Sequence, residues 1–282
     1  MVQSSFSIVV VCLNPGEKLA ATINSILAQQ YGNYEIIIKD GGSKDGSIEK
    51  LPADSRIRLF SEKDSGIYDA MNQALPRING QYVLFLNCGD LFYDDTVLTR
   101  IAKVIGNRKA ADSEKNHCAY KEKVRIFYGN QYNELQKCVV YSSPEVNDFT
   151  CYRNVPCHQV CFYDARLFEE RGYLTKYRVR ADYEHFLYCI YDRKAEAVYT
   201  ETLIARYEGG GFSETNENRR RSAEEHAEIT RHYLGREKVM RYKTMMLLTL
   251  APLRTRLAEN EKYAEAYNSV KTAVYKCLRK GK

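Results

Sequence analysis

The sequence predicts an α/β fold, with a mostly parallel central sheet flanked by helices and a helical tail at the end of the chain. Two observations indicate this class. Between residues 6 and 86, segments with the pattern of buried strands alternate with amphipathic helical segments, the order that produces a parallel sheet with helices on both faces. The first strand segment is also apolar along nearly its whole length, as expected for a strand covered on both faces.

Four strands are expected in this region, at Phe6–Cys12, Tyr34–Lys39, Ile57–Phe60 and Tyr82–Leu86. Apolar residues recur at helical spacing from Leu19 to Leu27, after the first strand, and again from Ile67 to Leu75, before the fourth. This spacing is typical of helices that pack one face on a sheet. We therefore expect the order β-α-β-α-β-α-β.

The rest of the chain is less regular. Further strands are expected at Val124–Tyr128 and Val139–Tyr141, with a hairpin as one arrangement, and at Val160–Tyr163 and Ala197–Thr200, which flank a helix at Tyr183–Tyr191. Beyond Gly209–Gly211 the chain becomes polar and helical, and a helix from Glu237 is interrupted near Pro252. We expect one large domain at residues 1–235 and a helical tail at residues 236–282.

The composition is that of a globular protein, with 282 residues of which 44% are hydrophobic and 28% charged. The start of the chain lacks the pattern of a secretory signal, and no run approaches the about 20 apolar residues of a membrane-spanning helix. The nine cysteines are therefore expected to be reduced thiols in the cytoplasm. The net charge of +6 suits an anionic ligand or surface, but it falls short of a nucleic-acid-binding composition, so no nucleic-acid partner is expected.

One cluster of cysteine and histidine can be interpreted as a zinc site. It consists of Cys151, Cys157, His158 and Cys161. The cluster lacks the C-x2-C pair of common zinc sites, so buried thiols are the favoured interpretation. A zinc-dependent regulatory protein stays open as an alternative function.

Polar residues follow each of the four expected strands. They are Asn14, the run Asp40–Ser47, the run Glu62–Gly66 and the run Asn87–Asp90. One such loop would be ordinary turn chemistry, but ligands of open parallel sheets bind beyond the carboxyl ends of the strands. Four polar loops at one edge therefore indicate a binding site.

The glycine spacing excludes several kinds of site. The patterns G-x-G-x-x-G after the first strand, G-x-x-x-x-G-K-[ST] and G-x-S-x-G are all absent, which argues against a dinucleotide site, a P-loop and a hydrolase serine. A carboxylate-lined site without a phosphate-binding glycine loop indicates a divalent metal that bridges protein oxygens and a diphosphate.

Several ordered motifs resemble family 2 glycosyltransferases, in particular the bacterial branch that builds capsule, O-antigen and exopolysaccharide. The motifs are Phe6–Val11, Asp40–Ser47, Ser61–Asn72, Phe85–Asp90, His158–Gln159 and Arg180–Glu184. The resemblance covers about residues 6–215 and leaves the tail outside it. It implies a GT-A fold, with a Rossmann-like donor half at about residues 1–108 and an acceptor half at about residues 109–235.

The resemblance also implies the chemistry, namely inverting transfer of a sugar from a nucleotide-diphosphate donor, with a UDP-sugar as the first choice. The acceptor would be a lipid-linked or growing saccharide. Asp182 matches the catalytic base, and Asp90 matches the last acid of the D-x-D-type motif that binds Mn²⁺ or Mg²⁺. The motif departs from its commoner form at Asn87 and Gly89, where aspartates often occur, which leaves metal affinity open. The donor-binding positions are Asn14, Asp40, Asp64, Asn72, His158, Gly211 and Ser213.

The residues alone leave alternatives for these roles. Asp182 would also suit a helix N-cap before Tyr183, and His158 a buried core position. Glu184 is a second candidate for the base, although two residues further along a helix it should face away. A sugar nucleotidyltransferase or a non-catalytic nucleotide-sugar binding module are the alternative functions.

The end of the tail combines basic and apolar residues at helical spacing. The basic residues are Lys271, Lys276, Arg279, Lys280 and Lys282, and the apolar ones are Val270, Val274, Cys277 and Leu278. This pattern is typical of a helix that lies on an anionic membrane surface. We therefore expect a peripheral protein at the inner face of the plasma membrane. Packing on the chain's own domain, or on a second copy in a homo-oligomer, is the alternative.

Overall fold

The computed structural model describes residues 4–115, 123–209, 215–249 and 269–270. Within these residues it is an α/β protein with one nine-stranded sheet, in the order β3-β2-β1-β4-β8-β6-β9-β5, and β7 pairs with β6. The strands are β1 (Phe6–Cys12), β2 (Tyr34–Asp40), β3 (Ile57–Ser61), β4 (Tyr82–Phe85), β5 (Leu91–Phe92), β6 (Arg125–Asn133), β7 (Cys138–Val140), β8 (Cys161–Asp164) and β9 (Glu196–Tyr207). The α-helices are α1 (Lys18–Leu27), α2 (Ile67–Ala74), α3 (Val97–Lys115), α4 (Asp148–Arg153), α5 (Ala181–Tyr191) and α6 (Asn216–Leu248).

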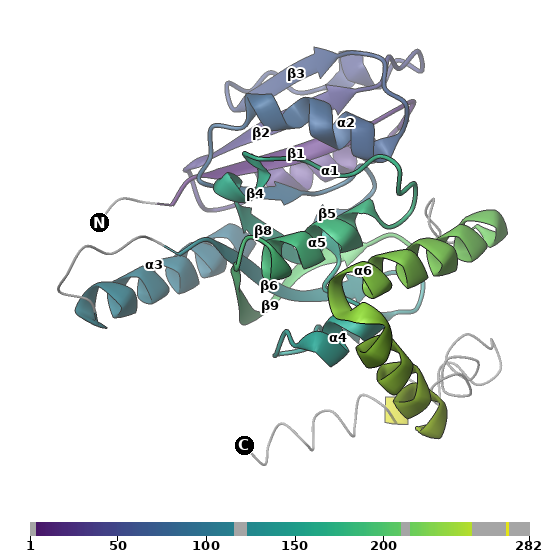
Figure 1. The fold of residues 1–282 in the computed structure, drawn as a ribbon. Coiled ribbons are helices and arrows are strands. Elements are labelled where there is room, and N and C mark those ends of the chain that lie inside the picture. The colour runs from purple at the N-terminus through teal and green to yellow at the C-terminus, as the bar shows by residue number, and fades with distance from the viewer. Residues whose placement is uncertain (1–3, 116–122, 210–214, 250–268, 271–282) are drawn as a thin grey trace.

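The first half of the sheet is parallel, as the sequence predicts. Phe6 of β1 pairs in register with Tyr34 of β2 and with Tyr82 of β4, and β2 pairs in parallel with β3. The helices α1 and α2 lie on opposite faces of these strands (Figure 1). They cover both faces of β1, whose interior residues are fully buried, which explains why that strand is apolar apart from Ser7.

The prediction of a helix between the second and third strands is wrong. This connection contains only a single 3-10 turn, Ile48–Lys50. Gly42 and Gly46 in the same connection have positive φ angles of 96° and 74°, which a right-handed helix does not contain. The segment is therefore a turn-rich loop rather than a helical crossover.

The second half of the sheet is mixed, so the parallel arrangement does not extend across the whole sheet. Strand β8 is antiparallel to both β4 and β6, whereas β9 is parallel to β6 and antiparallel to β5. The predicted hairpin is confirmed, because Gln131 of β6 pairs with Val140 of β7 in an antiparallel register. The strand expected at Ala197–Thr200 is longer and extends to Tyr207.

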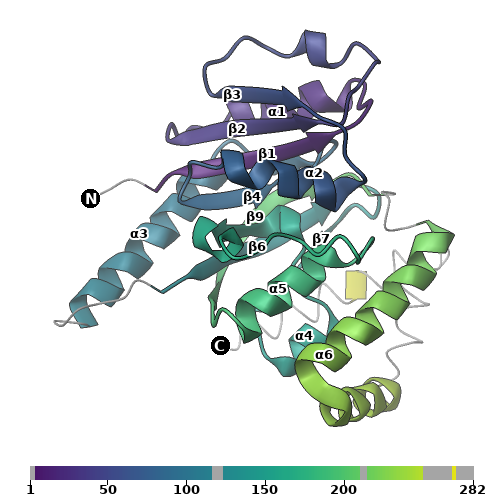
Figure 2. The ribbon, with the colours of Figure 1, turned by 45° about the horizontal axis from the view of Figure 1, so that its top comes forward.

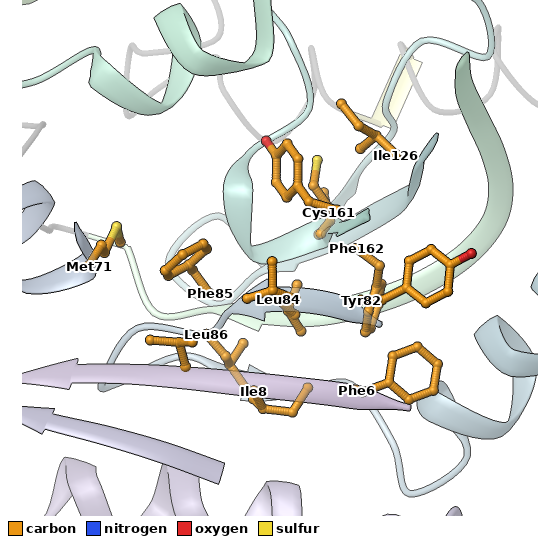
Figure 3. Packing of buried hydrophobic residues seen from close by; sticks show 14 of the residues in the cluster. Phe6, Ile8, Met71, Tyr82, Leu84, Phe85, Leu86, Ile126, Cys161 and Phe162 are labelled. Carbon is orange, nitrogen blue, oxygen red and sulfur yellow. The ribbon is translucent and has the colours of Figure 1, made fainter. Parts of the chain in front are cut away.

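The two halves share one hydrophobic core. Figure 3 shows Phe6 and Ile8 of β1 and Leu84 of β4 on the same side as Phe162 of β8, and the rings of Phe6 and Phe162 lie 5.4 Å apart in an edge-to-face contact. Such aromatic contacts add to the burial of large apolar surfaces. Strands β1 and β4 therefore pack directly against the second half of the sheet.

Helix α6 has two parts separated by Gly235, whose backbone is not helical (φ 77°, ψ 163°). The second part packs on α4, because Lys238 Nζ lies 2.6 Å from an Asp148 carboxylate oxygen and the Tyr242 ring lies 5.4 Å from that of Phe149. The helix expected from Glu237 is thus preceded by a helix that begins at Asn216 (Figure 2). The break near Pro252 lies outside the described residues, and the division into a catalytic domain and a tail stays a prediction.

No helix in the described part of the chain is both long enough and apolar enough to cross a membrane.

Candidate functional site

A cavity of about 540 Å³ lies at the carboxyl ends of β1 and β4. Its lining includes Leu13 after β1, the run Asp64–Ala70 after β3, Asn87 and Cys88 after β4, and Arg178 before α5. The prediction that polar loops gather at this edge is confirmed for these three strands. The cavity also reaches the second half of the chain, since Arg178 belongs to the segment that leads into α5.

The loop after β2 is tied to the loop after β1 by side-chain hydrogen bonds. Asn14 donates its backbone N–H to Ser43 Oγ (2.7 Å) and accepts the Lys44 N–H on Oδ1 (2.8 Å). Asp40 is buried at the end of β2 and accepts hydrogen bonds from the Ser43 N–H and hydroxyl (3.0 and 2.5 Å). Burial acts to raise the pKa of Asp40, but the bonds from Ser43 outweigh it and the pKa is lowered. Asp40 is thus an anion within its own loop, and donor binding by Asp40 and Asn14 stays a prediction.

A buried lysine, which the sequence pattern did not reveal, joins the loops after β2 and β3. The Lys39 side chain is inaccessible to solvent, and its Nζ lies 2.8 Å from Asp64 Oδ2 and 2.6 Å from the Glu62 carbonyl oxygen. A buried charge requires such partners. Because Asp64 lines the cavity, Lys39 fixes the position of one of the predicted donor-binding carboxylates.

Asn72 connects α2 to the segment before α5. Its amide nitrogen donates to the Tyr173 carbonyl and its amide oxygen accepts the Tyr173 N–H, both at 2.8 Å. Both ends of this side chain are therefore used in packing the two halves together. A role in donor binding stays a prediction.

Three side chains that are distant in the sequence form a continuous hydrogen-bonded series. Asp182 Oδ2 lies 2.9 Å from His158 Nδ1, and His158 Nε2 lies 2.8 Å from the amide nitrogen of Asn87. An ionised carboxylate can only accept hydrogen bonds, so His158 donates from Nδ1 to Asp182. The series starts at the cavity wall, where Asn87 lies, and ends at Asp182. The sequence predicted the residues but not their contact.

Asp182 lies in the first turn of α5 and is only partly buried, with 23% of its side chain exposed. Its Oδ1 accepts a hydrogen bond from the hydroxyl of Tyr68, which lines the cavity (2.8 Å). Burial acts to raise the pKa of Asp182, but the hydrogen bond and charge of His158, with the bond from Tyr68, outweigh it and the pKa is lowered. The side chain is therefore a carboxylate at neutral pH. Tyr68 was not identified from the sequence as a site residue.

The alternatives for this position are resolved by α5 itself. The N-cap is Arg180, so Asp182 is not the capping residue. Glu184 faces away and forms an ion pair with both terminal nitrogens of Arg171 (2.8 and 2.9 Å). Of the two acidic residues, Asp182 is thus the one placed near the cavity.

Glu225 of α6 holds the backbone that precedes α5. Its buried carboxylate accepts the N–H groups of Arg178, Val179 and Arg180 at 2.8–3.0 Å. These groups have no partner within the helix, so Glu225 satisfies them and fixes where α5 starts. Asp182 follows two residues later. No local sequence signal distinguishes Glu225 from the other acidic residues of a polar helix.

Asp90 ends the tight turn that follows β4. Its N–H donates to the Asn87 carbonyl (2.9 Å), and Gly89 has a φ of 103°. A Cβ at Gly89 would lie 2.6 Å from a Glu208 carboxylate oxygen. The backbone of the turn therefore explains why glycine stands where the family pattern often has aspartate.

The Asp90 carboxylate is 5% exposed and contacts the second half of the chain. It accepts hydrogen bonds from the Gln159 amide (3.0 Å) and from the Glu208 N–H (3.2 Å). Burial raises the pKa of Asp90, although the bonds from Gln159 and Glu208 oppose this effect. A nearby cation would favour the charged form of this group.

The residues around Asp90 fit a divalent cation that shares its coordination with a ligand. The amide oxygen of Asn87 is buried and has no hydrogen-bond partner, and it lies at the opposite end of the same turn. One carboxylate and one amide oxygen are hard donors suited to Mg²⁺ or Mn²⁺ completed by substrate phosphates and waters. In the described ranges, no three His, Cys, Asp or Glu residues come together as a self-sufficient metal site. This finding includes the cluster at residues 151–161.

Lys18, at the start of α1, is a cation on the cavity wall. It forms an ion pair with Glu208 at 2.7 Å, and this hydrogen-bonded contact raises the pKa of Lys18. Glu208 thus contacts both groups, Lys18 through its carboxylate and Asp90 through its backbone N–H. The sequence pattern did not indicate either residue. The predicted donor-binding residues Gly211 and Ser213 lie outside the described residues.

The chain is similar to known proteins in sequence and in fold. Residues 7–151 match the family described as "Glycosyl transferase family 2". The chain is 29% identical over 222 residues to a PGL/p-HBAD biosynthesis glycosyltransferase of Mycobacterium bovis (strain BCG / Pasteur 1173P2), which covers 76% of this chain and 81% of that protein.

Similar folds occur in solved structures at low sequence identity. The mannosyltransferase PcManGT from Pyrobaculum calidifontis, in complex with GDP-Man and Mn²⁺, matches with a TM-score of 0.59 and 15% identity over 97% of this chain and 87% of that one. S. aureus TarS matches with a TM-score of 0.57 and 16% identity over 73% of this chain, which spans 37% of TarS. TarS 1–349 in complex with UDP-GlcNAc matches with a TM-score of 0.55 and 16% identity, over 82% of this chain and 71% of that one. These likenesses confirm the predicted GT-A type of fold.

Proposed function

Because the chain belongs to glycosyl transferase family 2, we propose that it transfers a sugar from a nucleotide-diphosphate donor to a saccharide acceptor with inversion at the anomeric carbon. The observation that carries this proposal is the position of Asp182. It is an ionised carboxylate that is partly exposed and is joined to the cavity wall through Tyr68 and through His158 and Asn87. The donor is proposed to occupy the cavity at the ends of β1 and β4.

In the proposed reaction Asp182 acts as the general base. The acceptor hydroxyl gives its proton to the Asp182 carboxylate while its oxygen forms a bond to the anomeric carbon. The bond between that carbon and the diphosphate oxygen breaks, and the diphosphate leaves with the electron pair. A carboxylate within hydrogen-bond reach of the hydroxyl is sufficient for this step. His158 donates to Asp182 and orients it, and Glu225 fixes the helix start that carries it.

The negative charge of the leaving diphosphate requires a positive environment. Lys18 and Arg178 line the cavity and would contact phosphate oxygens. Asp90 and Asn87 would hold Mg²⁺ or Mn²⁺, which when bound supplies further neutralisation of the diphosphate. Support for a nucleotide-sugar donor comes from the structural neighbours, of which one holds GDP-Man with Mn²⁺ and another UDP-GlcNAc. A UDP-sugar is the proposed first choice.

The proposal is tested by donor binding and turnover of the full chain. Nucleotide sugars, UDP-linked and GDP-linked, are added with Mn²⁺, and the melting temperature is measured, because a ligand that binds only the folded state raises it. Release of nucleoside diphosphate is then followed for the wild type, Asp182→Asn and the control Asp192→Asn, which changes an exposed carboxylate at the other end of α5. No stabilisation by any nucleotide sugar, or equal turnover by Asp182→Asn, would contradict the proposal.

We further propose that the acceptor is lipid-linked, as in bacterial surface polysaccharide synthesis, and that the tail brings the enzyme to an anionic membrane surface. The support is an exposed apolar group at the end of α6, where Leu248 is 79% exposed beside the exposed Leu247 and Met240. Basic residues accompany it on the same part of the helix, including Arg241 and Lys243. The basic cluster from Lys271 onward lies outside the described residues.

Sedimentation with anionic liposomes tests the membrane proposal. The full chain should sediment with the liposomes at low salt and less so at high salt. Each basic residue near the anionic surface contributes about 1 kcal/mol of electrostatic attraction, which salt screens. Leu247→Asp combined with Leu248→Asp should weaken sedimentation, whereas Leu59→Asp, an exposed leucine of β3, should not. If the wild type stays in the supernatant, the tail is instead a contact with its own domain or with a second copy.

A further inference from the structure

The second half of the chain contains a second cavity, of about 350 Å³, that the proposed reaction does not yet use. Its lining comes from the hairpin β6–β7, from α4 and the segments on either side of it, and from α5; these labelled elements can be located in Figure 2. Gln131 of β6, Arg153 of α4 and Phe186 of α5 belong to its lining. The donor cavity shares none of these residues, so the two cavities are separate in the described structure.

The walls of this cavity are held in place by hydrogen bonds. On one side, Ser142 bonds to β6 through its backbone N–H, which donates to Asn130 Oδ1 (3.0 Å), and through its hydroxyl, which donates to the Gly129 carbonyl (2.6 Å). On the other side, the Tyr183 hydroxyl of α5 donates to the Cys151 carbonyl of α4 (2.5 Å). Walls fixed in this way are typical of preformed ligand sites.

The second cavity is linked to the proposed catalytic base through neighbouring residues of the chain. Cys157 lines the second cavity, and the next residue, His158, contacts both Asp182 and Asn87, the latter at the wall of the donor cavity. Burial raises the pKa of the Cys157 thiol to about 12, and the charges of Asp182 and Asp90 add to this effect. A residue of the second cavity is therefore the direct chain neighbour of the residue that bonds to the proposed base.

The lining indicates an uncharged, hydroxylated ligand. The charged residues among those that line it are one acid, Glu145, and one base, Arg153, which leaves no net charge for a phosphate. Apolar side chains such as Val160 and Phe186 lie together with amide and hydroxyl groups. Sugar rings have apolar C–H faces and hydroxyl edges, and a mixed lining of this kind complements both.

Gln131 carries an acceptor that the protein leaves unused. The residue is 8% exposed, it lines the cavity, and its Oε1 has no hydrogen-bond partner. A buried acceptor without a partner costs about 1–3 kcal/mol, and a ligand hydroxyl that donates to it would remove that cost. We propose that this cavity binds a neutral sugar unit of the acceptor and that Gln131 recognises one of its hydroxyl groups. This inference rests on the proposed function for the assignment of the ligand as the acceptor.

The absence of tryptophan from the chain allows a direct binding test. Ser143→Trp places a single tryptophan on an exposed residue of the cavity lining, and its emission is followed while neutral disaccharides are added to the full chain. Leu59→Trp on β3 is the matched reporter remote from the cavity. We expect a saturable change with the first reporter and none with the second. Adding Gln131→Leu to the first reporter should weaken disaccharide binding about tenfold, the loss of one hydrogen bond.

The outcomes separate this inference from the proposed function. No saturable response of the Ser143→Trp chain to any neutral disaccharide would overturn it, and so would an unchanged affinity after Gln131→Leu in a chain whose melting curve shows it to be folded. A response to phenols or to inorganic phosphate in place of sugars would also overturn it. Sugar binding in a chain that no nucleotide sugar stabilises would retain the saccharide site and reject the transferase reaction.

Discussion

Asp40, in the proposed donor half, and Asp182, the proposed base in the acceptor half, are positioned by different kinds of contact. In the donor half, Asp40 is fixed by Ser43, three residues away in the sequence. In the acceptor half, Asp182 is fixed by Tyr68, 114 residues away, and by His158, 24 residues away. A local turn therefore holds Asp40 itself, whereas Asp182 depends on the assembly of distant segments, as does the contact of Lys39 with Asp64, 25 residues away. Substitutions that disrupt one half should consequently have different measurable effects from substitutions that disrupt the other.

The largest expected effect is at Asp90, where the two halves meet. Asp90→Asn keeps the shape of the side chain but removes the charge that would hold a divalent cation. Since such a cation supplies several kcal/mol at a departing diphosphate, turnover should fall roughly 10³-fold, and a chelator should have the same effect on the wild type. Nucleoside diphosphate release measures both. Full activity in excess chelator would mean that Lys18 and Arg178 neutralise the diphosphate without metal.

The next effect is at Asp182 and separates catalysis from donor binding. Asp182→Asn retains an oxygen for the bonds from Tyr68 and from the Tyr183 N–H, but it cannot take a proton. We expect kcat to fall roughly 10²-fold or more while the affinity for the nucleotide sugar is unchanged. The two quantities are measured by steady-state kinetics and by calorimetric titration. A loss of donor affinity as large as the loss of kcat would show that Asp182 also contributes to donor binding.

Glu225 tests whether the start of α5 sets the position of the base. Glu225→Ala leaves three N–H groups without their acceptor, which should lower the free energy of unfolding by about 3 kcal/mol. Because Asp182 follows two residues after Arg180, the Glu225→Ala variant should lose more in kcat than in donor affinity. The Glu225→Gln variant, which keeps a side-chain oxygen as acceptor, should retain more of the wild-type kcat than Glu225→Ala. Urea unfolding and steady-state kinetics measure the two effects. Equal losses in kcat and donor affinity would indicate general unfolding instead.

The smallest effect at neutral pH concerns His185, in the core of the acceptor half. Burial, with the charge of Arg171, lowers its pKa to about 3, and its ring stacks on Phe168 at 4.3 Å. Below its ordinary pKa of about 6.5 the unfolded chain binds a proton that the folded chain does not, so stability is lost as the pH falls from 6.5 toward 3.

At pH 5 this loss amounts to about 2 kcal/mol, from 1.36 kcal/mol per pH unit. His185→Phe should remove it and leave a flatter dependence of unfolding free energy on pH, measured by urea denaturation at pH 5 and pH 7. The same slope in both proteins would place the acid sensitivity elsewhere, with the half-buried His226 as the next histidine whose pKa is lowered by burial.

Much of the donor half could be predicted from the sequence because its signals are local. A strand buried on both faces is apolar along nearly its whole length, and this pattern alone identifies β1. The polar turns at Asn14, Asp40 and Asp90 follow directly from strand ends. The one error there, a helix between β2 and β3, arose because the alternation of elements was extended over a loop whose glycines adopt positive φ angles.

The fold class, the main strands and the residues at the strand ends can be predicted from the sequence, because burial imposes a periodic pattern on neighbouring residues. Which of those residues meet is known from the folded arrangement alone. The contact of Asp182 with His158, the burial of Lys39 between two loops and the support of α5 by Glu225 all join residues at least 23 positions apart. Such contacts leave no periodic trace in the sequence, since they depend on how separately formed elements pack and on the need of each buried charge or N–H group for a partner.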